Sequence, residues 1–326
     1  MKEYIGKIDV LKETMLFVTN EIFGNNIKES TTKEDILNML PEIYTNADTE
    51  TIIKMLPYDS YKMLKKLVNY AKESNDIKTF LNESNMQGAF YLQEAMIIIL
   101  RAKYGKYNYS VNGKVLEILE KIFTEENEKI AERYGEMEKL IWGMLYSYGV
   151  VEENFFRKMI CKYMKEMISP EELEDFLFIR LNLNNKVFTQ SIKWTELNKV
   201  ETFITYLDEE YYDVENIIIE QKSRGLKYKI FSKEEILKRK EDLWDDKTKE
   251  FFKVLKDRNI DVWEYSFKKM LKNNELGFNI TREILDLCEC KEEKEIQQII
   301  SIFNEWYNNS PQYYLGGYSP IEFANT

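Results

Sequence analysis

Apolar residues recur every three or four positions along most of the chain, a spacing that is typical of amphipathic helices. Residues 7–23 carry the first such stretch, and Gly24 directly after it predicts the end of a helix. Only 5 Pro and 12 Gly in 326 residues interrupt the pattern, so the fold class is predicted to be mainly α. We expect further helices over about residues 31–40, 76–83, 88–104, 111–134, 135–148, 152–167, 170–181, 246–257, 261–272, 280–288 and 292–308.

A short internal repeat lies near the start of the chain, where residues 36–41 (ILNMLP) and 52–57 (IIKMLP) share their pattern. Pro41 is expected to stop or restart a helix, so the repeat predicts a compact cluster of short helices over about residues 31–73. The size of this cluster resembles the small helical Rho-N or SAP-like modules. We favour the simpler interpretation, a three-helix packing unit.

Residues 137–206 follow a different order. Three predicted helices, over 137–148, 152–167 and 170–181, precede an alternating stretch at 186–194 that predicts a short β-ribbon. Because this is the order of a winged helix, we expect multi-helical modules with a central winged-helix-like segment carrying that ribbon.

The helix over 170–181 would occupy the position of a recognition helix in such a fold. Its outward side is expected to carry Glu172, Glu174, Asp175 and Arg180, and its apolar side to include Phe178. Three carboxylates against one arginine would be repelled by phosphate, so this segment is better suited to contact a protein than DNA.

The length of the chain predicts more than one domain, because single hydrophobic cores stop growing near ~250–300 residues. An apolar content of 44%, with 14% aromatic residues, provides enough bulky side chains to fill several cores. We expect an N-terminal helical region over 1–134, a winged-helix-like domain over 135–230 and a C-terminal helical domain over 231–326.

The net charge of −11 gives no general support for binding nucleic acid or an anionic membrane. One basic stretch stands out, with a short strand predicted over 225–231 and a helix capped by Ser232-Lys-Glu-Glu235. We interpret it first as a solvated basic face and second as a site for an anionic partner. Its cations are Lys222, Arg224, Lys227, Lys229, Lys233, Lys238, Arg239 and Lys240.

The chain contains no histidine, which excludes Ser-His-Asp and Cys-His catalysis and every zinc site built with imidazole. Its three cysteines, Cys161, Cys288 and Cys290, cannot form a four-cysteine zinc site and are expected to be reduced thiols. Neither GxxxxGK[ST] nor GxGxxG occurs. We therefore expect no catalytic residues, metal site or cofactor.

No signal peptide is expected, because the first residues lack an uninterrupted apolar segment. The most apolar stretch, residues 89–102, is too short to span a membrane and predicts a buried core helix. A cytoplasmic protein without membrane contacts is the resulting expectation.

Three local motifs carry a resemblance: Leu145-Tyr-Ser-Tyr-Gly149-Val150, Tyr228-Lys-Ile-Phe-Ser232-Lys-Glu-Glu235, and the stretch from Asn308 to Gly317-Tyr-Ser319-Pro320-Ile-Glu322. They resemble those of an uncharacterised family from Gram-positive bacteria with a Rho-N-like start and, in some members, a metal-binding SEC-C tail. The resemblance implies a helical architecture and a bacterial or phage cytoplasm. It implies no catalytic residues, and the Cys-rich tail is absent from this sequence.

These observations favour a non-enzymatic interaction or regulatory protein that binds a protein partner, with nucleic acid as the less favoured partner. A histidine-free phosphodiesterase that uses carboxylates and Mg²⁺ is the first alternative. A phage- or defence-related binding protein is the second. Three or more carboxylates that converge in a cleft would favour the enzyme.

Overall fold

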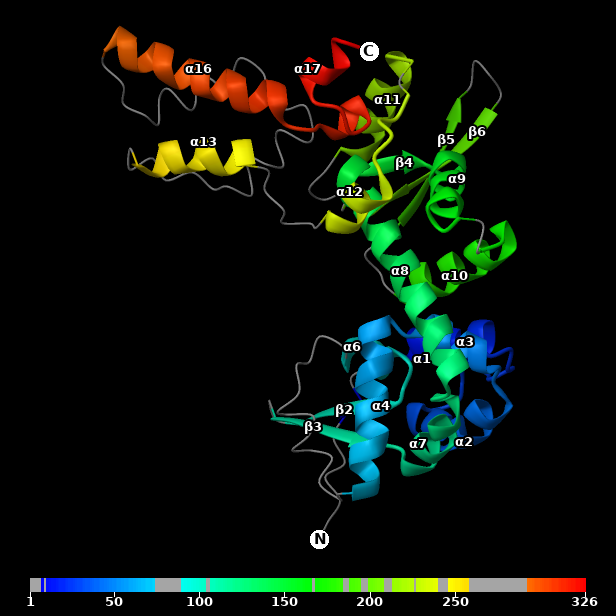
Figure 1. Ribbon diagram of the computed structural model, residues 1–326. Helices are drawn as coiled ribbons and strands as arrows, with labels where there is room; N and C mark the ends of the chain where they lie inside the picture. Colours follow the sequence, from blue (N-terminus) through cyan, green and yellow to red (C-terminus); the bar gives the residue numbers. More distant parts are fainter. Residues whose placement is uncertain are drawn as a thin grey trace. The chain divides into compact units, whose positions relative to one another are not determined.

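The computed structural model describes residues 7–8, 10–73, 89–103, 106–165, 168–183, 188–194, 199–207, 213–225, 227–239, 246–257 and 292–326. The protein is mainly helical, as predicted, and has two small antiparallel sheets (Figure 1). The chain forms two compact units, which are described separately below. Unit 1 comprises residues 1–138 and 169–185, and unit 2 comprises residues 139–168 and 186–326.

The first predicted helix is shorter than expected. Residues 7–8 form strand β1, which pairs with a later strand, and the helical part comprises α1 (Lys12–Leu16) and the π-helix η1 (Phe17–Ile22). Met15 and Val18 are fully buried, as their spacing predicts. Gly24 adopts a positive φ of 67° after the last helical turn, so the predicted helix end is confirmed.

The repeat lies in three helices, α2 (Lys33–Asn46), α3 (Thr49–Met55) and α4 (Tyr58–Glu73). The prediction that Pro41 stops or restarts a helix is wrong, because α2 continues through it. The additional turn buries Ile43 and Tyr44, and the Tyr44 hydroxyl donates to the carbonyl of Ala95. These contacts offset the backbone hydrogen bond that proline cannot donate.

The single helix expected over 88–104 is also wrong. The structure has a short helix α6 (Ala89–Glu94), a turn at Met96 with φ of 57°, and strand β2 (Ile98–Lys103). β2 is the central strand of the first sheet, between β1 and β3 (Lys106–Val111). A short, uninterrupted apolar run fits a central strand as well as a buried helix, and three consecutive isoleucines favour the strand.

Helix α8 (Glu125–Tyr148) follows α7 (Gly113–Leu119) and the 3₁₀ turn η3 (Glu120–Ile122). The break predicted between 134 and 135 is therefore wrong, and the actual break lies where the Thr124 hydroxyl accepts from the amide of Asn127. Gly135 lies within α8. A Cβ at this position would be 2.6 Å from Cβ of Tyr58 in α4, so the residue has to be a glycine for the two helices to approach this closely. Helix α10 (Pro170–Leu183) contacts α3 and completes unit 1.

The second sheet, in unit 2, has the order β4-β6-β5, from strands β4 (Val150–Glu152), β6 (Lys199–Thr205) and β5 (Phe188–Trp194). The predicted ribbon is the β5–β6 hairpin. Val150 and Phe203 belong to a core with helix α11 (Val214–Ser223). The buried Val151 and Ile204 share the other face, and helix α9 (Glu153–Tyr163) contacts both of their strands.

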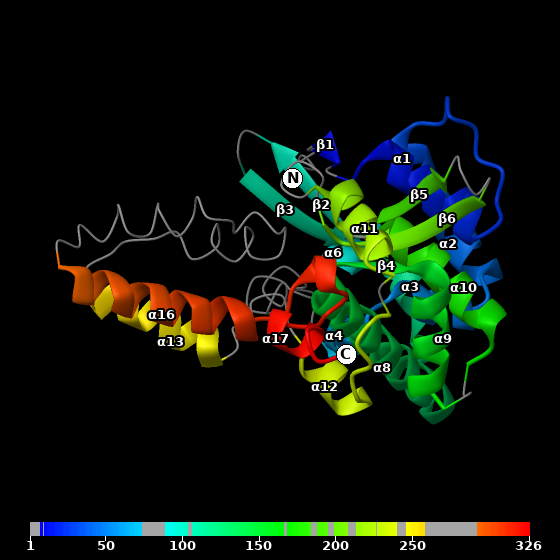
Figure 2. The ribbon, with the colours of Figure 1, turned by 90° about the horizontal axis from the view of Figure 1, so that it is seen from above.

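The rest of unit 2 consists of α12 (Lys233–Lys238), α13 (Asp246–Asp257), α16 (Glu293–Asn309), the turn η4 (Tyr313–Leu315) and α17 (Pro320–Phe323). α13 and α16 lie side by side (Figures 1 and 2), and the Phe251 and Trp306 rings stack with centroids 4.4 Å apart. The capping boxes of α12 and α17 are both formed. The strand predicted over 225–231 is wrong, because the described residues of this segment are not in a strand.

The predicted helices over 76–83, 261–272 and 280–288, and with them Cys288 and Cys290, lie outside the described residues. The winged-helix arrangement and the boundaries after residues 134 and 230 stay predictions. α10 lies in unit 1, whereas α9 and the ribbon lie in unit 2. No helix among the described residues is long and apolar enough to span a membrane.

Substitution of Gly149, directly after α8, tests how far the stability of unit 2 depends on the close contact of this residue with Tyr313. The φ of Gly149 is 67°, and a Cβ would lie 2.4 Å from the Tyr313 ring, whereas Gly225, with φ of 60°, has open space. We expect Gly149→Ala to lower the stability of unit 2 by roughly 3 kcal/mol and Gly225→Ala by about 1 kcal/mol. All five tryptophans lie in unit 2, so tryptophan fluorescence during urea unfolding measures both variants. Equal losses would contradict a steric role for Gly149.

Buried tyrosines predict loss of stability at high pH. Burial raises the pKa of Tyr44, Tyr148 and Tyr228, and raises that of Tyr61 and Tyr163 to about 12. Above about pH 10, these groups ionise in the unfolded chain but not in the folded one, so stability is complete below that pH and declines as pH rises through the folded values.

Absorbance at 295 nm is expected to show two tyrosine populations during an alkaline titration. One ionises near pH 10, and the other ionises together with the loss of helical circular dichroism. A single transition of all 22 tyrosines near pH 10, with the helix signal intact, is the result that would contradict this prediction.

Candidate functional site

The basic stretch predicted from the sequence lies in unit 2, and two of its lysines are held in ion pairs. Lys222 Nζ lies 2.8 Å from a Glu201 carboxylate oxygen and 3.3 Å from one of Glu152. Lys229 Nζ lies 2.6 Å from Glu322. Burial raises the pKa of that carboxyl group, but the hydrogen bond and charge of Lys229 and the hydrogen bonds from Ser319 together lower it below its ordinary value. These cations stabilise contacts between segments of unit 2.

The other cations of the stretch are arranged differently. Arg224 pairs with Glu220 one helical turn away at 2.7 Å, and the guanidinium of Arg239 lies over the Phe231 ring. Lys240 lies outside the described residues. Lys227 and Lys238 are exposed, and Lys233 is partly buried. The stretch is therefore partly a structural element of unit 2, and its binding of an anionic partner stays a prediction.

The three motifs behind the family resemblance meet in one place in unit 2. The Tyr148 hydroxyl donates to the Lys229 carbonyl at 2.5 Å, and the Tyr148 and Phe231 ring centroids are 5.6 Å apart. The Lys229 amide donates to the carbonyl of Gly316, and a Cβ on Gly317 would lie 3.1 Å from both rings. These motifs therefore form a packed junction.

A buried hydrogen-bond network connects this junction to the sheet. The Gln221 amide donates to the carbonyls of Tyr313 and Val150 at 2.7 and 3.3 Å. The Tyr228 hydroxyl donates to the Gln221 side-chain oxygen and accepts from the backbone amide of Glu152, both at 3.0 Å. Each of these groups is satisfied within the protein, which indicates a structural role.

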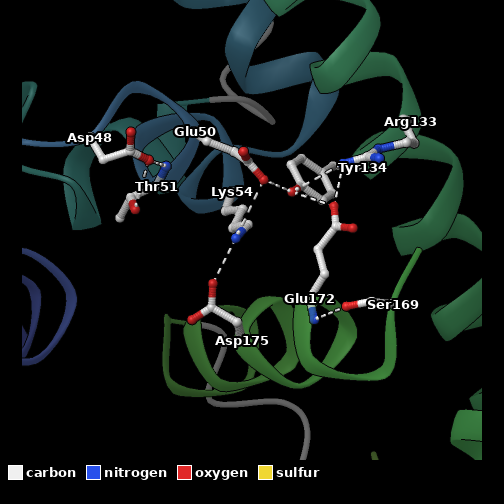
Figure 3. Close-up of polar contacts among 9 residues, drawn as sticks. All are labelled: Asp48, Glu50, Thr51, Lys54, Arg133, Tyr134, Ser169, Glu172 and Asp175. Carbon is white, nitrogen blue, oxygen red and sulfur yellow. Dashed lines mark hydrogen bonds and ion pairs between the residues drawn. The ribbon is translucent and has the colours of Figure 1, made fainter. Parts of the chain in front are cut away.

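A second polar cluster, in unit 1, joins α3, α8 and α10 (Figure 3). Lys54 has a side chain only 10% exposed, and its Nζ lies 2.6 Å from Asp175 and 3.5 Å from Glu50. Burial alone would lower the pKa of Lys54, but the hydrogen bond and charge of Asp175, with the charge of Glu50, raise it above its ordinary value. Lys54 therefore connects α3 to α10 as a cation.

Tyr134 lies beside Glu50 and a third carboxylate, Glu172. Its hydroxyl is within hydrogen-bonding distance of Glu50 and of Glu172, and Arg133 pairs with Glu172 (Figure 3). Burial first, and then these two carboxylates, raise the pKa of Tyr134. A phenol carries one proton, so Tyr134 donates to only one of the two carboxylates at a time. When it donates to Glu50, Arg133 compensates the negative charge of Glu172.

This cluster brings together three carboxylates, those of Glu50, Glu172 and Asp175, as the enzyme alternative requires. Lys54, Arg133 and the Tyr134 hydroxyl lie between them as donors, so the arrangement is that of an ion-pair network. Among the described residues, no group of three His, Cys, Asp or Glu side chains could hold a metal ion.

The predicted outward side of α10 is wrong at two positions. Arg180 is 6% exposed, with one amino group donating to the Met55 carbonyl and the other 3.2 Å from Glu138. Burial lowers its pKa and the charge of Glu138 opposes this. Phe178, assigned to the apolar side, is instead 45% exposed. Helical spacing could have placed Phe178 outside, since Glu171, Glu174 and Asp175 lie on the same face.

We call the exposed residues Glu171, Glu174, Asp175 and Phe178 the α10 outer face. The Phe178 ring lies 5.8 Å from the ring of Phe17, which is itself partly exposed. This face combines an exposed aromatic ring with exposed carboxylates next to the unit 1 polar cluster.

Comparisons with known proteins identify no relative: no family model, no curated protein and no solved structure matches the chain. The resemblance to the Gram-positive family therefore stays a prediction.

Two lysines of unit 1 offer a matched test of the polar cluster. Lys54 and Lys62 each have Nζ 2.6 Å from a carboxylate, but the Lys62 side chain is 45% exposed and its partner Asp59 is 84% exposed. We expect Lys54→Ala to lower the stability of unit 1 by about 2 kcal/mol, less than a fully buried pair because Asp175 remains hydrated. Lys62→Ala should change it by at most about 0.5 kcal/mol.

Far-UV circular dichroism during urea unfolding measures this difference, while tryptophan fluorescence follows unit 2 alone. Similar losses for both lysine variants would show that the cluster makes no special contribution.

Proposed function

We propose that the chain is a non-enzymatic interaction protein that binds a protein partner. The observation that carries this proposal is the α10 outer face, where Phe178 is 45% exposed on a helix that buries an arginine. Aromatic side chains that contact one another at the surface are typical of protein interfaces, since their apolar area is removed from water only when a partner binds.

The charge of the same helix supports a protein over nucleic acid. Glu171, Glu174 and Asp175 are exposed around Phe178 and repel phosphate. Lys222 and Lys229 of the basic stretch already pair with carboxylates of unit 2, which reduces the positive charge available to a nucleic acid. A regulatory role through such a protein partner is part of this proposal.

The proposal predicts a nuclease-resistant complex. We expect affinity purification of the tagged chain from its host to retain the same protein partner with and without nuclease treatment. Mass spectrometry identifies the retained proteins, and a tagged unrelated acidic protein is the control for nonspecific capture. Retention that disappears after nuclease treatment, or no specific protein in either sample, would refute the proposal.

A further inference from the structure

The solvent side of α10 follows directly from helical geometry. Glu171, Glu174, Asp175 and Phe178 are spaced by three and four residues, so they share one side of the helix, and all four are exposed. The other side packs into unit 1 through the buried Leu173, Phe176, Leu177 and Ile179. One helix side is therefore packed in the core and the other is exposed to solvent.

Phe178 provides an apolar position on this face. Its ring centroid lies 5.8 Å from that of Phe17 in η1, and the planes are tilted by 50°. Because both rings keep solvent-accessible area, an apolar side chain of a partner can contact the two of them together. The pair thus provides an anchor position rather than a single exposed residue.

The charges around this anchor have one predominant sign. α10 and the start of α3 carry six carboxylates. Three of the six pair with one of the two cations Lys54 and Arg133. Lys54 is nearly buried, so the exposed part is more negative than this count indicates. The carboxylates belong to Asp48, Glu50, Glu171, Glu172, Glu174 and Asp175 (Figure 3 shows those of Asp48, Glu50, Glu172 and Asp175).

We propose that the α10 outer face docks a basic amphipathic protein segment, with one apolar residue on Phe17 and Phe178 and Lys or Arg side chains beside the carboxylates. This inference rests on the proposed function and specifies the chemistry of the partner. Charge complementarity selects the basic segment, and it excludes an anionic polymer at the same face.

A labelled helical peptide of Lys, Ala and Leu, about 18 residues long, serves as the probe, and its counterpart with Glu in place of Lys is the control. We expect fluorescence anisotropy to show saturable binding of the basic peptide to the full chain and none of the acidic peptide. Affinity should decrease as salt is raised from about 50 to about 200 mM, because exposed charges are screened.

Matched variants locate the site. Phe178→Ala is expected to weaken binding about tenfold, and Phe90→Ala, which changes another half-exposed phenylalanine of unit 1, should have no effect. Glu174→Lys is expected to weaken binding by a similar factor, whereas Glu293→Lys on α16 is the charge control. Circular dichroism verifies that each variant is folded.

Equal affinities of the Phe178→Ala and Phe90→Ala proteins would overturn the inference, as would equal binding of the acidic peptide or no binding at about 1 mM basic peptide. Self-association that Phe178→Ala abolishes would identify a second copy as the occupant and also overturn it. A host protein retained equally by the Phe178→Ala chain refutes this inference alone. The absence of any nuclease-resistant partner refutes the proposed function instead.

Discussion

The close approach of Tyr313 to Gly149 is the constraint on which unit 2 depends. A side chain at residue 149 would occupy the space of the Tyr313 ring, and the positive φ of Gly149 turns the chain from α8 into β4. The Thr205 hydroxyl donates to the Gly149 carbonyl and so connects β6 to the same turn. One glycine therefore allows a helix end, a strand and the turn near the C-terminus to pack together.

Charged residues in both units mainly connect segments that are distant in the sequence. Lys54 pairs with Asp175 across 121 positions, and Lys229 pairs with Glu322 across 93. Such pairs are possible only after the helices have packed, because each lysine side chain loses conformational freedom when it is fixed. A cation in a basic stretch of sequence can therefore be a structural group, as Lys229 is.

Local signals predicted local structure well. Ser232 forms the capping box that its sequence predicts, and Gly24 ends the first helical segment, because these features depend on neighbouring residues only. Helix α13 lies at its predicted position for a similar reason, since its apolar spacing is regular.

Contacts between distant segments determine the features that the sequence pattern did not predict. The apolar run that begins at Ile98 forms strand β2 because it pairs along its whole length with β3 and, at Arg101 and Ala102, also with β1. Pro41 stays inside α2 because Tyr44 reaches Ala95. The polar cluster was not predictable either, since Glu50, Tyr134 and Glu172 come from three separate helices.

Two positions of α10 depart from the usual rule that apolar residues are buried and charged ones exposed. Arg180 is buried and needs Glu138 and the Met55 carbonyl as partners, while Phe178, two positions earlier, stays in contact with water. Exchanging their environments would avoid the cost of desolvating a guanidinium and would bury an aromatic ring. Departures from local consistency concentrate at functional sites, because selection for binding preserves an arrangement that selection for stability would remove. These two departures on α10 therefore support our proposal that this helix contacts the partner.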